Sequence, residues 1–104
     1  MIELPSKIDN IFKNIKQLSP KELGIRKKLD IFIAIDEDDK VNAILHIVQK
    51  SRFLQKDVDK IEEILNIVKD SKEENIDNKV IVIESPLCSK AKVKLENLSW
   101  KVIV

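Results

Sequence analysis

The hydrophobic positions of the chain form short apolar runs separated by amphipathic stretches. Ser6 is a favourable helix N-cap, and apolar residues recur after it at helical spacing from Ile8 to Leu18, which predicts an N-terminal helix. The segment Ser19-Pro20-Lys21-Glu22 repeats the signal for a helix start. Gly24 follows so closely that we expect only a short turn there.

Two apolar runs in the first half of the chain predict a β-hairpin. The run from Leu29 to Ile35 is short and rich in β-branched residues, as in a buried strand. The run from Val41 to Val48 fits both a helical stripe and strand alternation, but its short length and β-branched content favour a strand. Residues 36–40 would then form the hairpin loop, with the two strands antiparallel.

The second half predicts two helices that each lead into a strand. An amphipathic helix follows Lys56, an apolar strand covers Val80 to Ile83, Ser85-Pro86 caps a second helix, and a final strand follows from Trp100. Helical crossovers join parallel strands, so we expect a single α/β domain over residues 1–104. Its mixed sheet of about four strands would follow the order N-terminal helix, β-hairpin, helix, strand, helix, strand, with helices packed on the sheet.

Composition narrows the function classes without selecting one. The 104 residues are 43% hydrophobic and carry a formal charge of +1, which excludes disorder and gives no overall field for nucleic acid or membranes. The single cysteine cannot form an internal disulfide and the N-terminus lacks a secretory pattern, so we expect a cytoplasmic protein with no membrane partner. The 17 Lys against 2 Arg indicate an AT-rich bacterial or archaeal genome, which weakens lysine abundance as a sign of phosphate binding.

The segment after the strand at Val80 to Ile83 is the first candidate binding site, because ligands of open α/β sheets lie beyond the carboxyl ends of parallel strands. Ser85, Ser89 and Lys90 are its candidate anion-binding residues, at the start of a helix. Ser85 alternatively serves only as a helix cap. Cys88 lies where a helix dipole lowers a thiol pKa, but it shares a face with apolar residues, and we expect a structural role.

A second candidate site lies between a strand and a helix. It combines Lys50, Arg52, Phe53 and Lys56, a composition suited to phosphate contact and base stacking. Phe53 and Leu54 fit better as anchors of the following helix in the core. Nucleic-acid binding and a purely structural segment therefore both remain open.

Catalytic patterns are weak. One cysteine and one histidine do not supply the usual set of zinc ligands, so no metal site is assigned, and His46 is expected to be a strand or interface residue. A Ser-His-Asp triad cannot be placed, because no glycine-flanked serine is present. The residue pattern alone therefore assigns no catalytic residue.

A family resemblance suggests one enzymatic alternative. The segment Ile83-Glu84-Ser85-Pro86 resembles the first motif of the Toprim domains of type IA topoisomerases, and Ala34-Ile35-Asp36-Glu37-Asp38 is similar to their second. The two motifs occur here in the reverse order, Lys40 stands where the family has a further acidic residue, and the hairpin puts a strand where Toprim has a helix. The resemblance implies a divalent cation such as Mg²⁺ held by Asp36, Asp38 and Glu84 for phosphoryl transfer. Without it, the acidic run is a solvated turn.

Taken together, the sequence favours a small non-enzymatic interaction module that binds a protein or a nucleic acid and needs no cofactor. The alternative is a divalent-metal-dependent nuclease or phosphotransferase that uses Asp36, Asp38 and Glu84.

Overall fold

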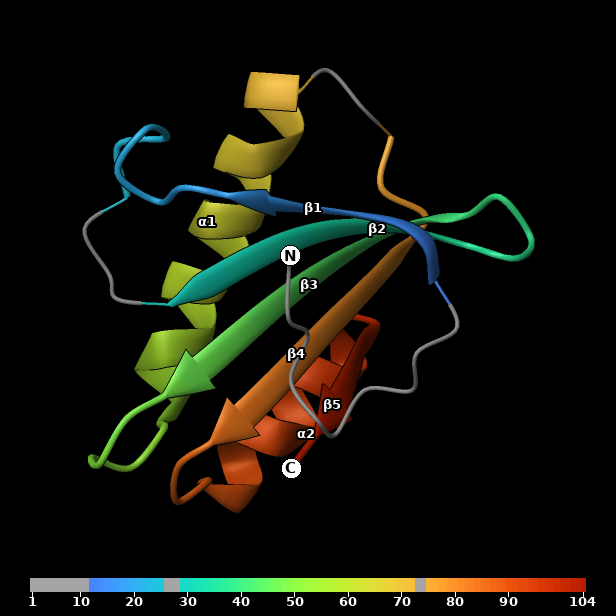
Figure 1. The fold of residues 1–104 in the computed structure, drawn as a ribbon. Helices are drawn as coiled ribbons and strands as arrows, with labels where there is room; N and C mark the ends of the chain where they lie inside the picture. Colours follow the sequence, from blue (N-terminus) through green and yellow to red (C-terminus); the bar gives the residue numbers. More distant parts are fainter. Residues whose placement is uncertain (1–11, 26–28, 73–74) are drawn as a thin grey trace.

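The computed structural model describes residues 12–25, 29–72 and 75–104, and this part contains five strands and two helices (Figure 1). In chain order the elements are β1 (Phe12–Leu18), β2 (Asp30–Asp36), β3 (Val41–Val48), α1 (Gln55–Lys72), β4 (Asn78–Glu84), α2 (Ser89–Asn97) and β5 (Trp100–Ile103).

The strands form one mixed sheet in the order β1-β2-β3-β4-β5. β1, β2 and β3 pair antiparallel, whereas β3, β4 and β5 pair parallel through the two helical crossovers. The predicted hairpin is confirmed, with Ile31 opposite Leu45 and Ile35 opposite Val41. The α/β class and the strand-helix-strand units are also confirmed, and the sheet has five strands where about four were expected.

The extra strand replaces the predicted N-terminal helix, which is wrong over Phe12–Leu18. Residues 6–11 of that prediction lie outside the described residues. Ile15 pairs with Ala34 and Leu18 with Ile31, so the two apolar side chains point to opposite faces of the sheet. Apolar residues at a spacing typical of a helical stripe therefore lie on both faces of a strand. By pairing with β2, β1 also provides hydrogen-bond partners for the backbone groups on the outer side of β2.

The short turn predicted around Gly24 is confirmed. The N–H groups of Leu23 and Ile25 donate to the carbonyl of Pro20 at 3.1 and 2.8 Å. Gly24 has a φ of +74°, a conformation that glycine adopts without steric cost. The chain therefore reverses direction here before it enters β2.

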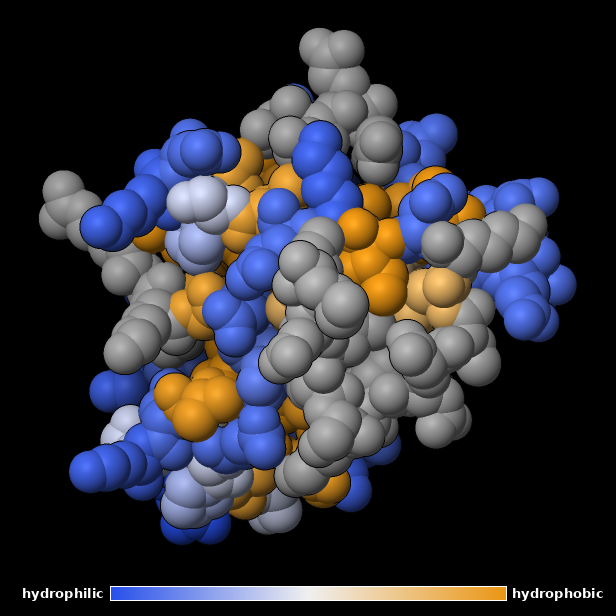
Figure 2. Space-filling model, in the orientation of Figure 1, coloured by the Kyte–Doolittle hydropathy of each residue, from blue (hydrophilic) through white to orange (hydrophobic). Residues whose placement is uncertain are grey.

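Both helices pack on the same face of the sheet (Figure 1). Side chains alternating along the three central strands meet α1 and α2 there and form the main core, including Ile31, Leu45, Ile47, Ile81, Ile83, Ile61, Leu65 and Leu95. The opposite face carries a smaller buried cluster of Phe32, Ala34, Ile44 and Val80. Figure 2, in the same orientation, shows apolar residues between hydrophilic ones.

Polar contacts fasten the helices to each other and to β5. The indole N–H of Trp100 donates to Glu62 Oε1 on α1 at 3.0 Å. The ammonium of Lys94 on α2 lies 2.9 Å from Asp59 Oδ1 on α1. The last parallel strand is thus tied to the first crossover helix.

The start of α2 differs from the prediction. The helix begins at Ser89 with Cys88 as N-cap, so Ser85-Pro86 do not cap it. Instead the N–H of Phe53 donates to the Pro86 carbonyl at 2.8 Å, and the N–H of Cys88 donates to the Phe53 carbonyl at 3.0 Å. This backbone remains extended because it forms a parallel bridge between Phe53 and Leu87.

The core role of Phe53 is directly testable, since its side chain is 0% exposed. We expect Phe53→Ala to lower the free energy of unfolding by about 3–5 kcal/mol, measured by urea denaturation. The adjacent, partly exposed Leu54 is the control, and Leu54→Ala should cost less than about 1 kcal/mol. Equal losses in both variants would contradict the assignment.

Candidate functional site at the carboxyl edge of the sheet

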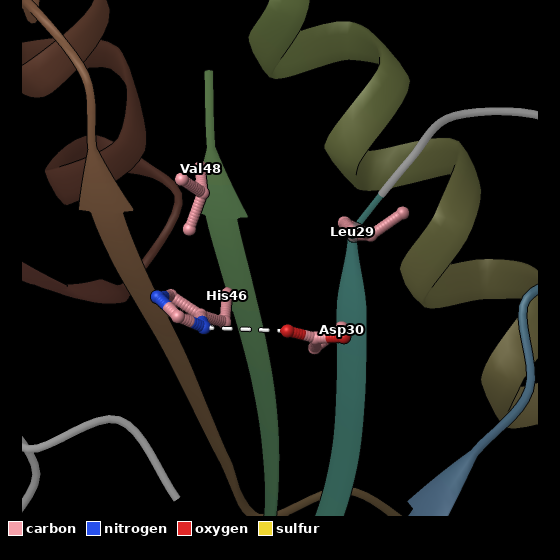
Figure 3. A pocket seen from close by; sticks show the side chains of 4 residues that line it. All are labelled: Leu29, Asp30, His46 and Val48. Carbon is pink, nitrogen blue, oxygen red and sulfur yellow. Dashed lines mark ion pairs between the residues drawn. The ribbon is translucent and has the colours of Figure 1, made fainter.

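An imidazole lies between two carboxylates that come from the neighbouring strands. His46 on β3 is directly opposite Asp30 on β2, and its Nδ1 lies 3.5 Å from Asp30 Oδ2 (Figure 3). Its Nε2 is hydrogen-bonded to Glu84 Oε2 on β4. Glu84 is the register partner of Val48, two residues further along β3, so all three side chains share the face opposite the helices.

A shallow pocket of about 100 Å³ adjoins this group, lined by Leu29, Asp30, His46 and Val48 (Figure 3). Only 13% of the His46 side chain is exposed, whereas 51% of the Asp30 and 40% of the Glu84 side chains are exposed. The imidazole is therefore held in place while both carboxylates still reach solvent. Such a group can accept a proton, donate one or orient a polar ligand.

Sequence reasoning missed this group because its members are far apart along the chain. His46 was expected to be only a strand or interface residue, Asp30 was not singled out, and Glu84 was assigned elsewhere. The hairpin was the available signal, since pairing residue 35 with 41 places residue 30 opposite 46. Glu84 could not be added without the register between β3 and β4.

The three carboxylates of the Toprim resemblance do not meet. Asp36 ends β2 and lies beside the start of β3, whereas Glu84 ends β4 and lies beside the end of β3. The eight residues of β3 separate the two edges by roughly 25 Å at about 3.3 Å per residue. Within residues 12–25, 29–72 and 75–104, no three His, Cys, Asp or Glu side chains are grouped to hold a metal ion. These residues therefore do not fit the expected Mg²⁺ site.

Asp36 instead organises the hairpin turn. Its Oδ1 accepts hydrogen bonds from the N–H groups of Asp38 (2.9 Å) and Lys40 (3.0 Å), and its Oδ2 accepts one from Asn42 Nδ2 (3.1 Å). The amide of Asn42, only 5% exposed, also donates to the Lys40 carbonyl at 3.1 Å. The Lys40 N–H, followed by Asn42, lowers the pKa of Asp36 below its usual value.

The predicted nucleic-acid residues lie on and after the loop that leaves β3. Lys50, Arg52 and Lys56 are exposed, but Phe53 is fully buried in the main core. The ring of Phe53 is therefore not presented for base stacking. The cationic part of the prediction remains at the surface, as a group of side chains around the start of α1.

Of the predicted anion-binding residues, Ser85 lies on the neighbouring loop after β4, whereas Ser89 and Lys90 lie in the first turn of α2. Ser89 and Lys90 are exposed, and Ser85 is half-buried. The two loops are held together by the backbone hydrogen bonds of the Phe53–Leu87 bridge and by the Gln49 N–H, 3.4 Å from the Glu84 carbonyl. Two candidates found separately in the sequence thus form one region, here called the carboxyl-edge surface: Lys50, Ser51, Arg52, Lys56, Ser85, Ser89 and Lys90.

Cys88 lies within this region as the N-cap of α2 and packs partly against the main core. Backbone N–H groups of Ala91 and Lys90 lower the pKa of its thiol, and the charges of Arg52 and Lys90 act in the same direction. Arg52 from one loop thus acts on a residue of the other. The structural role expected for Cys88 stays a prediction.

Comparisons with known proteins give a fold likeness. No family model matches the chain, and no curated protein matches it. The solved structure of EndoMS in its apo form matches with a TM-score of 0.61 and 17% sequence identity, over 95% of this chain. The match covers 40% of the EndoMS chain, so this chain corresponds to less than half of that protein. Separately, neither helix in the described ranges has the length and apolar character needed to cross a bilayer.

The hydrogen bonds of Asp36 predict a pH dependence. A carboxyl whose pKa is lowered in the folded state stabilises it above the unfolded value, near 3.8, and this contribution disappears as the pH falls through the folded value. We expect Asp36→Asn to unfold at lower urea concentration than the wild type at pH 6, and the difference to shrink below pH 3.8. The exposed neighbour variant Glu37→Gln should show no such convergence. A difference that stayed constant down to pH 2 would contradict this role.

Proposed function

We propose that this chain is a nucleic-acid-binding domain on a nuclease-like fold, and that the carboxyl-edge surface contacts the phosphate backbone. The observation that carries the proposal is the bridge between Phe53 and Leu87, which joins the cationic loop after β3 to the loop that leads from β4 into α2 and Lys90. That edge is where ligands of open α/β sheets are expected, beyond the ends of β3 and β4. Such a partner also fits the cytoplasmic location expected from the sequence.

The charges of this surface support a polyanionic partner. In the described part of the chain, Lys50, Arg52, Lys56 and Lys90 form no ion pair with a carboxylate, unlike Lys94 and Lys60. Cations that have no internal partner can release the counterions of a nucleic acid when they contact phosphates. Backbone groups and serines at the same edge add neutral donors.

The fold comparison also supports a nucleic-acid partner, at a coarse level. EndoMS is a nuclease, and its likeness to this chain lies in the arrangement of helices and strands. A shared fold does not carry an activity by itself. It makes a nucleic-acid partner a better supported reading than a protein partner, which the sequence left equally open.

The proposal predicts a salt-dependent affinity that depends on the two loops together. For three neutralised phosphates, the logarithm of the affinity for DNA should fall with the logarithm of salt concentration with a slope of roughly two to three. The triple variant Lys50→Ala/Arg52→Ala/Lys90→Ala should flatten that slope, as measured by fluorescence anisotropy.

A charge-matched control separates this surface from general charge effects. The variant Lys16→Ala/Lys21→Ala/Lys101→Ala removes three exposed lysines elsewhere and should leave the slope within about half a unit of the wild type. Equal losses in both triple variants would show non-specific attraction. Absence of binding to single- or double-stranded DNA or RNA at low salt would eliminate the proposal and leave a protein partner.

A second candidate function is phosphodiester hydrolysis beside this surface. The observation that favours it is the His46 imidazole held between Asp30 and Glu84 in a fold that resembles a nuclease. Here His46 would move the proton and the carboxylates would hold its ring, in place of the Asp36, Asp38 and Glu84 set. No step is assigned to a metal ion.

The hydrolysis candidate predicts cleavage of end-labelled oligonucleotides by the wild type, scored on denaturing gels with EDTA and again with Mg²⁺ or Mn²⁺. We expect His46→Ala to lower the rate by about 100-fold or more, because general acid–base catalysis contributes at least that much. Asp36→Asn, at the opposite edge, should keep the wild-type rate. Cleavage that survives in His46→Ala would mark a contaminant or another site.

A further inference from the structure

We propose that His46 makes the nucleic-acid affinity of the carboxyl-edge surface depend on pH, with tighter binding when the imidazole is protonated. This inference rests on the proposed function and adds its regulation. The geometry behind it is the position of His46 between Asp30 and Glu84 at the end of the sheet from which the loops after β3 and β4 leave.

The surroundings of the imidazole determine the sign of the effect. Among the described residues, the titratable groups that face His46 are Asp30 from β2 and Glu84 from β4. On β5, Ile103 lies at the register of Val82 next to His46, and Lys101 lies further down the same face. Both helices pack on the other face. The nearest charges are therefore two carboxylates.

The charge of this group changes when the histidine titrates. With a neutral imidazole the three side chains carry a formal charge of minus two, and with an imidazolium they carry minus one. A phosphate that approaches Lys50 or Lys90 meets this negative charge at the same edge. Protonation of His46 lowers the repulsion, so binding strengthens as the pH falls and weakens as the pH rises.

A second effect has the same sign. Glu84 is the last residue of β4, its carbonyl accepts the Gln49 N–H at 3.4 Å, and Ser85 follows it directly. An imidazolium attracts the Glu84 carboxylate more strongly than a neutral ring does. The point from which both loops leave the sheet is therefore held more firmly when His46 carries a proton.

The test uses the fact that His46 is the only histidine in the chain. A fluorescent oligothymidine of about 20 nucleotides is titrated with the protein at pH 5.5 and at pH 8.0, at one fixed ionic strength. Thymine has no group that titrates in this range. We expect the wild-type Kd to be about two- to fivefold lower at pH 5.5, as befits one partly screened charge.

Two variants make the result decisive. His46→Gln has a neutral side chain at both pH values and should bind with the same Kd at both, which also separates this effect from titration of Cys88. Lys50→Ala/Arg52→Ala/Lys90→Ala should weaken binding at both pH values and keep the wild-type ratio between them. The single imidazole NMR signal of the wild type should titrate over the pH range in which the Kd changes.

The outcomes separate this inference from the proposed function. Binding that is equal at both pH values while the imidazole signal titrates would overturn the inference and leave the proposed function intact. A pH dependence that persists in His46→Gln would do the same. No binding of any nucleic acid at either pH would overturn both.

Discussion

The parallel pairing of β3 with β4 is the contact on which the whole carboxyl edge depends. It directs both strands to the same edge, so that the loops after Val48 and after Glu84 leave the sheet side by side. Its register also sets Glu84 two residues beyond His46 on one face. An antiparallel β4 would carry Glu84 to the edge of the Asp36 turn. The single crossover through α1 therefore determines which charges meet.

Much of the fold follows from local patterns. The hairpin, both crossover helices and the parallel strands could be predicted because each depends on spacing within about 20 residues. The prediction of an N-terminal helix was wrong because the spacing of apolar residues from Phe12 to Leu18 also suits a strand whose side chains enter two separate cores. The predicted start of α2 was wrong because the backbone around Pro86 is hydrogen-bonded to Phe53, a partner that the local sequence does not reveal.

The separate parts of the candidate site could be predicted from the sequence, but their full arrangement in space could not. The cationic loop and the serine-containing loop were both identified, but their union depends on the Phe53–Leu87 bridge. The placement of Asp30 opposite His46 follows from the hairpin register and was within reach. The separation of Asp36 from Glu84 was equally within reach, because a hairpin followed by a parallel crossover must place these strand ends at opposite edges. The motif resemblance grouped Asp36 with Glu84, although the predicted topology already placed them at opposite edges.

The hydrogen bonds of Asn42, at the other end of β3, help to fix the register that places His46 beside its two carboxylates. Asn42 is buried on the same face as His46, where its side chain finds Asp36 and the Lys40 carbonyl. If β3 slipped by one residue, every side chain would change face, and both the amide and the imidazole would enter the apolar layer beneath the helices. A buried amide without partners is costly, so the slipped pairing is strongly disfavoured. Asn42 therefore fixes the register of β3. Through this register, the hydrogen bonds at the turn determine which side chains face solvent at the opposite edge of the sheet.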